Sequence, residues 1–290
     1  MSVQHPIIAI TGSSGAVTST VHSAFEHIFR RMNTTPLIVE GASFHRYNRS
    51  TMKQYTTLAE KEGRTFSHFG PEANLFEELE QQFKQYGENG TCKRRHYLHT
   101  TEDAACWGKK PGEFTAWENA PEGTDLLFYE GLHGALVAGE VDIAKQVDLK
   151  IGVVPIVNLE WIQKIHRDTA ERGYSAEAVT HTILRRMHDY VHYITPQFSR
   201  TDINFQRVSL VDTSNPFVAR DVPTLDESMV VINFQNPRNQ DFPYLLSRIN
   251  NSFMTRLDNL VVPGGKIGTA MELILTPIIT EMMARKRDDR

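Results

Sequence analysis

The stretch PIIAITGSSGAVTSTVHSAFEHIFRRM, residues 6–32, decides the predicted fold. The apolar run at 7–10 is typical of a buried strand, and apolar residues at helical spacing follow over 18–32. A glycine-rich loop separates the two. A strand, a glycine loop and a helix in this order form an anion-binding unit, because the loop amides and the helix N-terminus both attract negative charge.

Strand and helix patterns continue outward from this unit. We expect strands at 37–40, 125–129, 149–154, 205–211 and 228–234, and helices at 49–62, 71–86, 159–172, 177–190 and around Met271, Ile274, Leu275, Ile278 and Met282. A hairpin-like excursion is expected within 92–117. Strands that alternate with helices favour a mostly parallel sheet, and the later strands look antiparallel. The sequence therefore predicts an α/β fold, a mixed sheet flanked by helices, in a single compact domain over residues 1–290.

Composition narrows the class of protein. The charge is 31 − 35 = −4 and the pI is about 6.3, which argues against a general binder of nucleic acid or of an anionic membrane. The two cysteines, Cys92 and Cys106, are expected to be free thiols in a reducing compartment. No signal peptide and no stretch near the ~20 apolar residues of a membrane span is apparent. A cytoplasmic protein is expected.

The glycine loop departs from the pattern G-x-x-x-x-G-K-[ST]. It comprises Gly12, Ser13, Ser14, Gly15, Ala16, Val17, Thr18, Ser19 and Thr20. Val17 replaces the second glycine and Thr18 replaces the lysine. A β-branched residue forced to positive φ costs ~1–3 kcal/mol, so nucleotide binding would weaken. The hydroxyl of Ser19 suits Mg²⁺. An ordinary strand-to-helix turn remains the alternative.

Two further motifs carry candidate chemistry. Glu130 closes an apolar strand, where an acid can position Mg²⁺ near phosphates, although a surface acid is the alternative. Lys164, Asp168 and Arg172 are spaced by four residues, with Arg167 beside them, and can share one helix face. That face could deliver cations to a transferring phosphoryl group. The alternative is a solvated helix with weak ion pairs.

Scattered polar residues could bind an anionic small substrate. His45, Arg46, Arg49 and Lys53 follow the second strand, and His96 and His99 flank Tyr97 after a basic run at 93–95. Most histidines in a chain of this size are surface or core residues, which is the alternative. No pair has an HExxH-like spacing, so a transition metal is not expected.

Six blocks together resemble bacterial phosphoribulokinase, in the same order over essentially the whole chain. They are GSSGAVTST at 12–20, EGASFHRYNR at 40–49, FSHFGPEAN at 66–74, LLFYEGLHG at 126–134, KIGVVPIVNLEWIQKIHRD at 150–168 and VDTSNPF at 211–217. The resemblance implies a P-loop nucleotide-kinase-like fold. It implies phosphorylation of ribulose 5-phosphate at its 1-hydroxyl by ATP with Mg²⁺, in a homo-oligomer for which NADH and AMP are possible effectors.

The resemblance also assigns roles to residues. The 12–20 loop would hold the ATP phosphates, and Ser19 and Glu130 would serve the metal. Lys164 and Arg167 would assist phosphoryl transfer, with Asp168 as a second functional acid. The sugar phosphate would be bound by His45, Arg49, Lys53, His99 and Arg172.

Two departures from the family pattern fall on the chemistry. The family motif E-G-D-x-F-H-R carries a catalytic aspartate where this chain has Ala42. In the glycine loop, Val17 stands where the family has the last glycine. Alanine cannot accept a proton, and losing a general base costs ~10²–10⁴ in rate. The favoured hypothesis is a phosphoribulokinase with severely impaired catalysis. The alternatives are a non-catalytic binding or regulatory paralogue, and an active kinase that uses Asp168 as its base or another acceptor.

Overall fold

The computed structural model describes residues 4–12 and 19–288, which group into two compact units. The first unit comprises the residues up to Ile10, Thr35–Asp148 and Arg185–Arg200. The second comprises Thr11–Thr34, Leu149–Leu184 and the residues from Thr201 onward. Six residues of the predicted phosphate loop lie outside the described residues, namely Ser13, Ser14, Gly15, Ala16, Val17 and Thr18.

The first unit is built on the strand order β1-β5-β2. β2 and β5 are parallel, and their register places Glu40 opposite Glu130 at the carboxyl ends of both strands. Along β2 the side chains alternate between buried and exposed, as expected for a strand with one face on a core. The strand bounds are β1 Ile7–Gly12, β2 Pro36–Glu40, β3 Lys93–Arg94, β4 Glu118–Asn119, β5 Leu126–Gly131, β6 Val137–Ala138 and β7 Val141–Asp142.

Helices complete the first unit. Their bounds are α2 Arg49–Lys61, α3 Phe76–Asn89, α4 Thr101–Ala105 and α7 Met187–Asp189. The α3 helix buries Phe76, Leu79 and Phe83 in the core that also holds residues of β2 and β5. It ends at Gly90, whose φ of 73° is left-handed and suits glycine. The fold thus fixes the carboxyl ends of β2 and β5, where Glu130 and the turn at 41–45 lie.

The second unit has the strand order β11-β12-β10-β9-β8. β8 and β9 are parallel, whereas β9, β10, β12 and β11 pair antiparallel in turn. The bounds are β8 Leu149–Pro155, β9 Ile203–Ser209, β10 Ser228–Phe234, β11 Phe253–Arg256 and β12 Asn259–Pro263. The pairing confirms the predicted mixed α/β architecture, including the antiparallel later strands.

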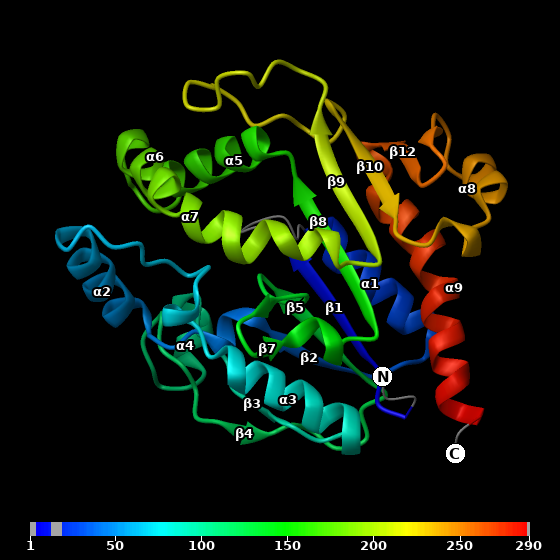
Figure 1. Ribbon diagram of the computed structural model, residues 1–290, viewed down its shortest axis with the longest axis horizontal. Helices are drawn as coiled ribbons and strands as arrows, with labels where there is room; N and C mark the ends of the chain where they lie inside the picture. Colours follow the sequence, from blue (N-terminus) through cyan, green and yellow to red (C-terminus); the bar gives the residue numbers. More distant parts are fainter. Residues whose placement is uncertain (1–3, 13–18, 289–290) are drawn as a thin grey trace. The chain divides into compact units, whose positions relative to one another are not determined.

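Helices α1 and α9 lie side by side in the second unit (Figure 1). The helix bounds there are α1 Ser19–Met32, α5 Val157–Ala170, α6 Ala176–Arg185, α8 Phe242–Arg248 and α9 Ile267–Asp288. One helical stretch of the described chain, Gly264–Lys286, is long and apolar enough to cross a membrane by length and composition, with a mean hydropathy of 1.3. The prediction that no stretch approaches that length was therefore wrong. Because it packs against α1 and β12, we interpret it as a core helix.

Most predicted elements are present with small shifts of their ends. The helix predicted over 159–172 ends at Ala170, so Arg172 lies just beyond it. The helix predicted over 177–190 is interrupted after Arg185, and a π-helical turn follows α7. In α9 the buried face carries Ile279 and Met283 rather than the predicted Ile278 and Met282. The predicted 92–117 excursion contains β3 and the unpredicted α4, and β3 pairs antiparallel with β4, which lies just beyond the predicted range. Both cysteines are free, as predicted.

Candidate active site

A tight turn follows β2 in the first unit, and we call residues Gly41–His45 the His45 turn. Gly41–Phe44 forms one 3₁₀ turn, and the amide of His45 donates to the carbonyl of Ala42 at 3.2 Å. A Cβ on Gly41 would lie 2.5 Å from Oη of Tyr129 and 2.9 Å from Cα of Gly131. The turn is therefore packed directly against the end of β5, which requires glycine at its first position.

That close packing joins the residue before Ala42 to the residue after Glu130. The register pairs Glu130 with Glu40, two residues before Ala42, and the carboxyl ends of parallel strands are where α/β proteins bind ligands. Ala42 is partly exposed there and presents only a methyl group. The edge of the first unit thus offers a half-buried carboxylate on β5 but no proton acceptor at position 42.

The imidazole of His45 is held by Asn74. The Asn74 amide is buried and donates to the carbonyls of His68 and Gly70, at 2.9 and 2.7 Å. Its oxygen faces Nδ1 of His45 at 2.9 Å. Burial lowers the pKa of His45, the hydrogen bond to Asn74 opposes this, and the charges of His99 and Arg95 lower it further. The net shift is downward, so His45 is neutral at neutral pH.

Arg95 fixes the backbone of the same turn. Its guanidinium donates to the carbonyls of Ser43 and His45, at 2.7 and 2.6 Å. The group lies over the rings of Phe114 and Trp117, at 3.9 and 4.7 Å from their centroids. Burial lowers the pKa of Arg95 to about 10, so it stays cationic at neutral pH. The basic run at 93–95 therefore supplies a structural clamp as well as charge.

The other predicted substrate residues of the first unit lie around this turn. Arg49 begins α2 and donates from Nη2 to the carbonyl of His99 at 2.9 Å. The ring of Tyr97 packs edge-on against both His45 and His99. Lys53 is exposed one turn further along α2. The structure thus brings His45, Arg49 and His99 into one neighbourhood, with Lys53 at its margin.

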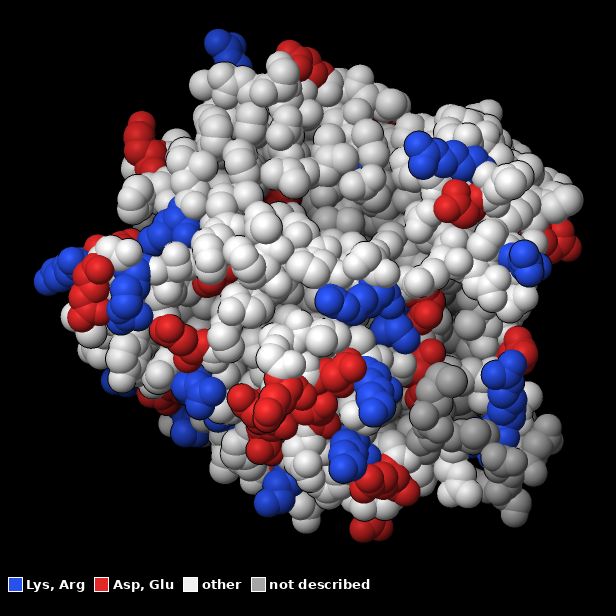
Figure 2. Space-filling view, in the orientation of Figure 1, with Lys and Arg blue, Asp and Glu red and all other residues white. Residues whose placement is uncertain are grey.

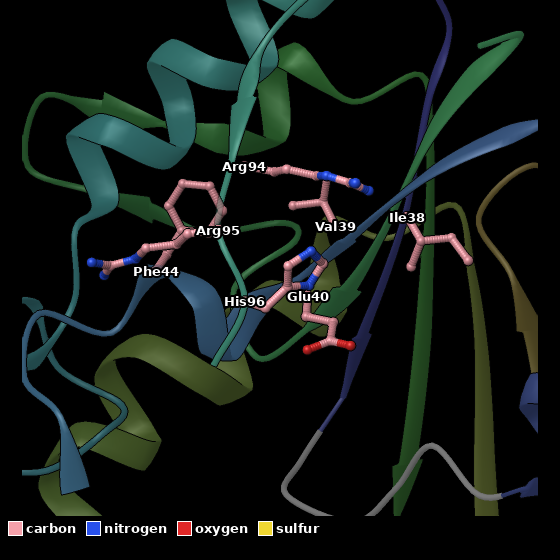
Figure 3. Close-up of a pocket in the computed structure, with 7 residues that line it drawn as sticks. All are labelled: Ile38, Val39, Glu40, Phe44, Arg94, Arg95 and His96. Carbon is pink, nitrogen blue, oxygen red and sulfur yellow. The ribbon is translucent and has the colours of Figure 1, made fainter. Parts of the chain in front are cut away.

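A small pocket opens beside the turn (Figure 3). Its volume is about 90 Å³, well below the ~300 Å³ at which ligand pockets begin, so it is too small for a sugar phosphate. It is lined by Ile38, Val39, Glu40, Phe44, Arg94, Arg95 and His96. Figure 3 shows Arg94 and Arg95 extending to opposite sides of the segment that carries them. Arg94 ion-pairs with Glu118 at 3.1 Å.

The predicted basic helix forms a charge network in the second unit, and we call Lys164, Arg167, Asp168 and Arg172 the Asp168 cluster. The Asp168 carboxylate is buried and contacts all three cations, at 2.5 Å from Lys164 Nζ, 3.1 Å from Arg167 Nε and 3.1 Å from Arg172 Nη1. Burial alone would raise the pKa of Asp168, but the hydrogen bond and charge of Lys164 and the charges of both arginines outweigh it. The net effect is a lowered pKa. The carboxylate therefore stays ionised and positions the cations.

The described ends of the predicted phosphate loop lie in the second unit. Gly12 is buried at the end of β1, while Ser19 is exposed and begins α1, followed by the partly buried Thr20. The Ser19 hydroxyl and the Glu130 carboxylate are hard oxygen donors of the kind that Mg²⁺ prefers, so both fit the predicted metal. Among residues 4–12 and 19–288, no group of three His, Cys, Asp or Glu side chains is placed to hold a metal ion.

Asn74 was missed as a functional residue by sequence reasoning. It lies in the block at 66–74, but its role depends on a long-range contact with His45 that no local pattern reveals. The loop before it is held in turn by Asp189, which accepts from Oγ of Ser67 at 2.7 Å. The only sequence feature that pointed to Asn74 was its place in the 66–74 block that resembles the family.

The surface carries both signs of charge. Figure 2 shows lysine and arginine intermingled with aspartate and glutamate on the face in view. This agrees with a net charge of −4, and the absence of a nucleic-acid partner stays a prediction.

Comparison with known proteins covers nearly the whole chain. Residues 7–214 match the model of the phosphoribulokinase / uridine kinase family. The chain is 60% identical over 288 residues to the plasmid phosphoribulokinase of Cupriavidus necator, and 59% identical over 287 residues to phosphoribulokinase of Nitrobacter vulgaris. These alignments cover 99% and 98% of both chains, respectively. The solved phosphoribulokinase from Rhodobacter spheroides has a TM-score of 0.91 at 56% identity, with 99% of this chain covered and 100% of that one.

Proposed function

The chain belongs to the phosphoribulokinase / uridine kinase family, and from that premise we propose that it transfers the γ-phosphoryl group of ATP to the 1-hydroxyl of ribulose 5-phosphate. The observation that carries the proposal is 60% identity over 99% of both chains with a phosphoribulokinase. The product would be ribulose 1,5-bisphosphate, the substrate of carbon fixation. We further propose a cytoplasmic homo-oligomer, a single kinase domain over the 290 residues, and NADH and AMP as effectors.

Each unit supplies a distinct part of this chemistry. In the first unit, His45, Arg49 and His99, with Lys53 at the margin, bind the sugar phosphate. In the second, Arg172 binds the same substrate, and Lys164 and Arg167 stabilise the charge of the transferring phosphoryl group. Asp168 holds these cations in place through the contacts described above. The loop 12–20 binds the ATP phosphates.

The metal is proposed to be Mg²⁺, held by Ser19 and Glu130. When bound, it would neutralise charge on the phosphate oxygens. The oxygen chemistry of the two side chains supports this choice over a transition metal.

We propose that the reaction is slow, because Ala42 stands at the position of the family's catalytic aspartate. The partly exposed methyl group of Ala42 cannot take a proton. Val17 adds a second lesion, because a β-branched side chain replaces a loop glycine. Asp168 is a poor substitute base, since three cations engage its carboxylate and its pKa is lowered.

Reversion tests both the activity and the impairment. Ribulose 5-phosphate-dependent ADP release is measured for the natural chain, Ala42→Asp, Val17→Gly and the double variant. The double variant should gain in kcat, by up to the ~10²–10⁴ that a general base contributes. Calorimetric titration with ribulose 5-phosphate should show binding in every form. Binding without turnover in the double variant would instead favour a non-catalytic regulatory paralogue.

A further inference from the structure

The hydrogen bonds around Asn74 fix the tautomer of His45. Both N–H bonds of the Asn74 amide point at carbonyl oxygens, of His68 and Gly70, which can only accept. The amide oxygen is therefore the atom that faces His45, and Nδ1 of the neutral imidazole must carry the proton that it donates at 2.9 Å. It follows that Nε2 carries the free lone pair.

Nε2 of His45 is available for a ligand. Among the described residues it makes no hydrogen bond, and it is not one of the polar atoms sealed in the interior without a partner. The ring is held from several sides by His68 at 4.9 Å and Tyr97 at 6.1 Å between centroids. Asn74 and Arg95 secure the ring and its backbone. The lone pair is thus both free and rigidly oriented.

His45 shares a side of the turn with position 42. In 3₁₀ geometry the side chains at i and i+3 eclipse one another, and the His45 amide closes this turn onto the carbonyl of Ala42. The titratable groups around the imidazole are His68 and Tyr97 in ring contact, and His99, Arg95 and the buried His133 through their charges. Burial and the two nearby basic groups lower the pKa of His45 from 6.5, which leaves the ring unprotonated at neutral pH.

We propose that Nε2 of His45 is the proton acceptor for the substrate hydroxyl in this chain, where Ala42 offers none. The inference rests on the proposed function. The 1-hydroxyl oxygen of ribulose 5-phosphate bonds to the γ-phosphorus of ATP as its proton passes to Nε2. The bond from that phosphorus to the β–γ bridging oxygen breaks, and ADP leaves with the electron pair. The imidazolium then returns its proton to water.

The effect of His45→Gln, measured with Ala42 and with aspartate at position 42, separates proton transfer by His45 from substrate binding by His45. His45→Gln keeps a hydrogen-bonding amide but cannot take a proton. It is made alone and together with Ala42→Asp, in each case with Val17→Gly so that nucleotide binding is not limiting. Without the aspartate, kcat should fall by ~10²-fold, and with it the change in kcat should be far smaller. The exposed His181→Asn is the matched control and should leave both backgrounds unchanged.

The kinetic outcomes distinguish proton transfer by His45 from substrate binding by His45. Equal losses of kcat in both backgrounds would overturn the proposal, because His45 would then only bind. Calorimetric binding of ribulose 5-phosphate without any turnover in the Ala42 background would also overturn it, while leaving substrate binding intact. Failure of binding in every form would instead reject the proposed function itself.

Nitrogen-15 NMR of the histidine side chains gives a readout that needs no turnover and no stable His45→Gln protein. The natural chain should show His45 as the Nδ1–H tautomer, titrating below 6.5, with kcat/KM falling in acid over the same range. Asn74→Leu removes the acceptor, so the fixed tautomer should be lost and kcat should fall. An Nε2–H tautomer in the natural chain would refute the proposal.

Discussion

The Asp168 cluster and the His45 turn each hold side chains in a fixed orientation, but they do so through different interactions. The cluster packs four charged residues into nine positions around one buried carboxylate. The turn uses a neutral imidazole held by an amide 29 residues away and a backbone clamped by Arg95. Strong local electrostatics orient the cations, whereas long-range hydrogen bonds orient the His45 imidazole. Removing the central group of each should therefore have different consequences.

The largest effect on stability is expected from Asp168→Asn. Lys164 and Arg167 are mostly buried at this site, with side-chain exposures of 13% and 26%, so losing the carboxylate leaves their charges uncompensated. We expect a loss of about 3 kcal/mol in the free energy of unfolding, measured by urea denaturation. Activity should fall as well, because the cations are no longer positioned.

The pH dependence of this loss has a definite sign. The pKa of Asp168 is lowered from 3.8 in the folded chain, so its contribution is fully present above that value. It should disappear as the pH falls below about 4 through the folded pKa. The natural chain and Asp168→Asn should therefore converge in stability in acid. A constant difference down to pH 2 would contradict the ion-pair account.

A smaller effect is expected from Gly41→Ala, which tests the packing of the His45 turn. The new Cβ would meet Tyr129 Oη at 2.5 Å and Gly131 Cα at 2.9 Å, and the backbone atom cannot move aside cheaply. We expect a loss of about 2 kcal/mol, as for an overpacked core. Gly268→Ala in α9 is the control, because its nearest neighbour is a threonine methyl at 3.3 Å. Equal stability of Gly41→Ala and the natural chain would show that the turn is not packed as described.

The same contrast explains what the sequence could predict. The Asp168 cluster follows from helical spacing alone, so all four of its members were predicted, although Arg172 lies beyond the end of α5. The strand β1, the helix α1 and the mixed strand pairing were also predictable, because the periodicity of apolar residues is a local signal. Asn74 could not be predicted, since its partner is set by how the 67–74 loop returns to the turn. Likewise, the sequence offered only a basic run at 93–95, and only the fold shows that Arg95 is bonded to two backbone carbonyls.

The smallest effect on stability is expected from Arg172→Gln, and it sharpens the contrast within the cluster itself. Arg172 contacts the same carboxylate oxygen as Arg167, but its side chain is 54% exposed, so solvent screens the pair. The free energy of unfolding should change by less than about 1 kcal/mol.

If Arg172 binds the sugar phosphate, KM for ribulose 5-phosphate should rise while kcat changes little, and KM for ATP should stay constant. Steady-state kinetics on the Ala42→Asp/Val17→Gly background would measure this. A fall in kcat with an unchanged KM for ribulose 5-phosphate would place Arg172 with Lys164 and Arg167 at the transferring phosphoryl group instead.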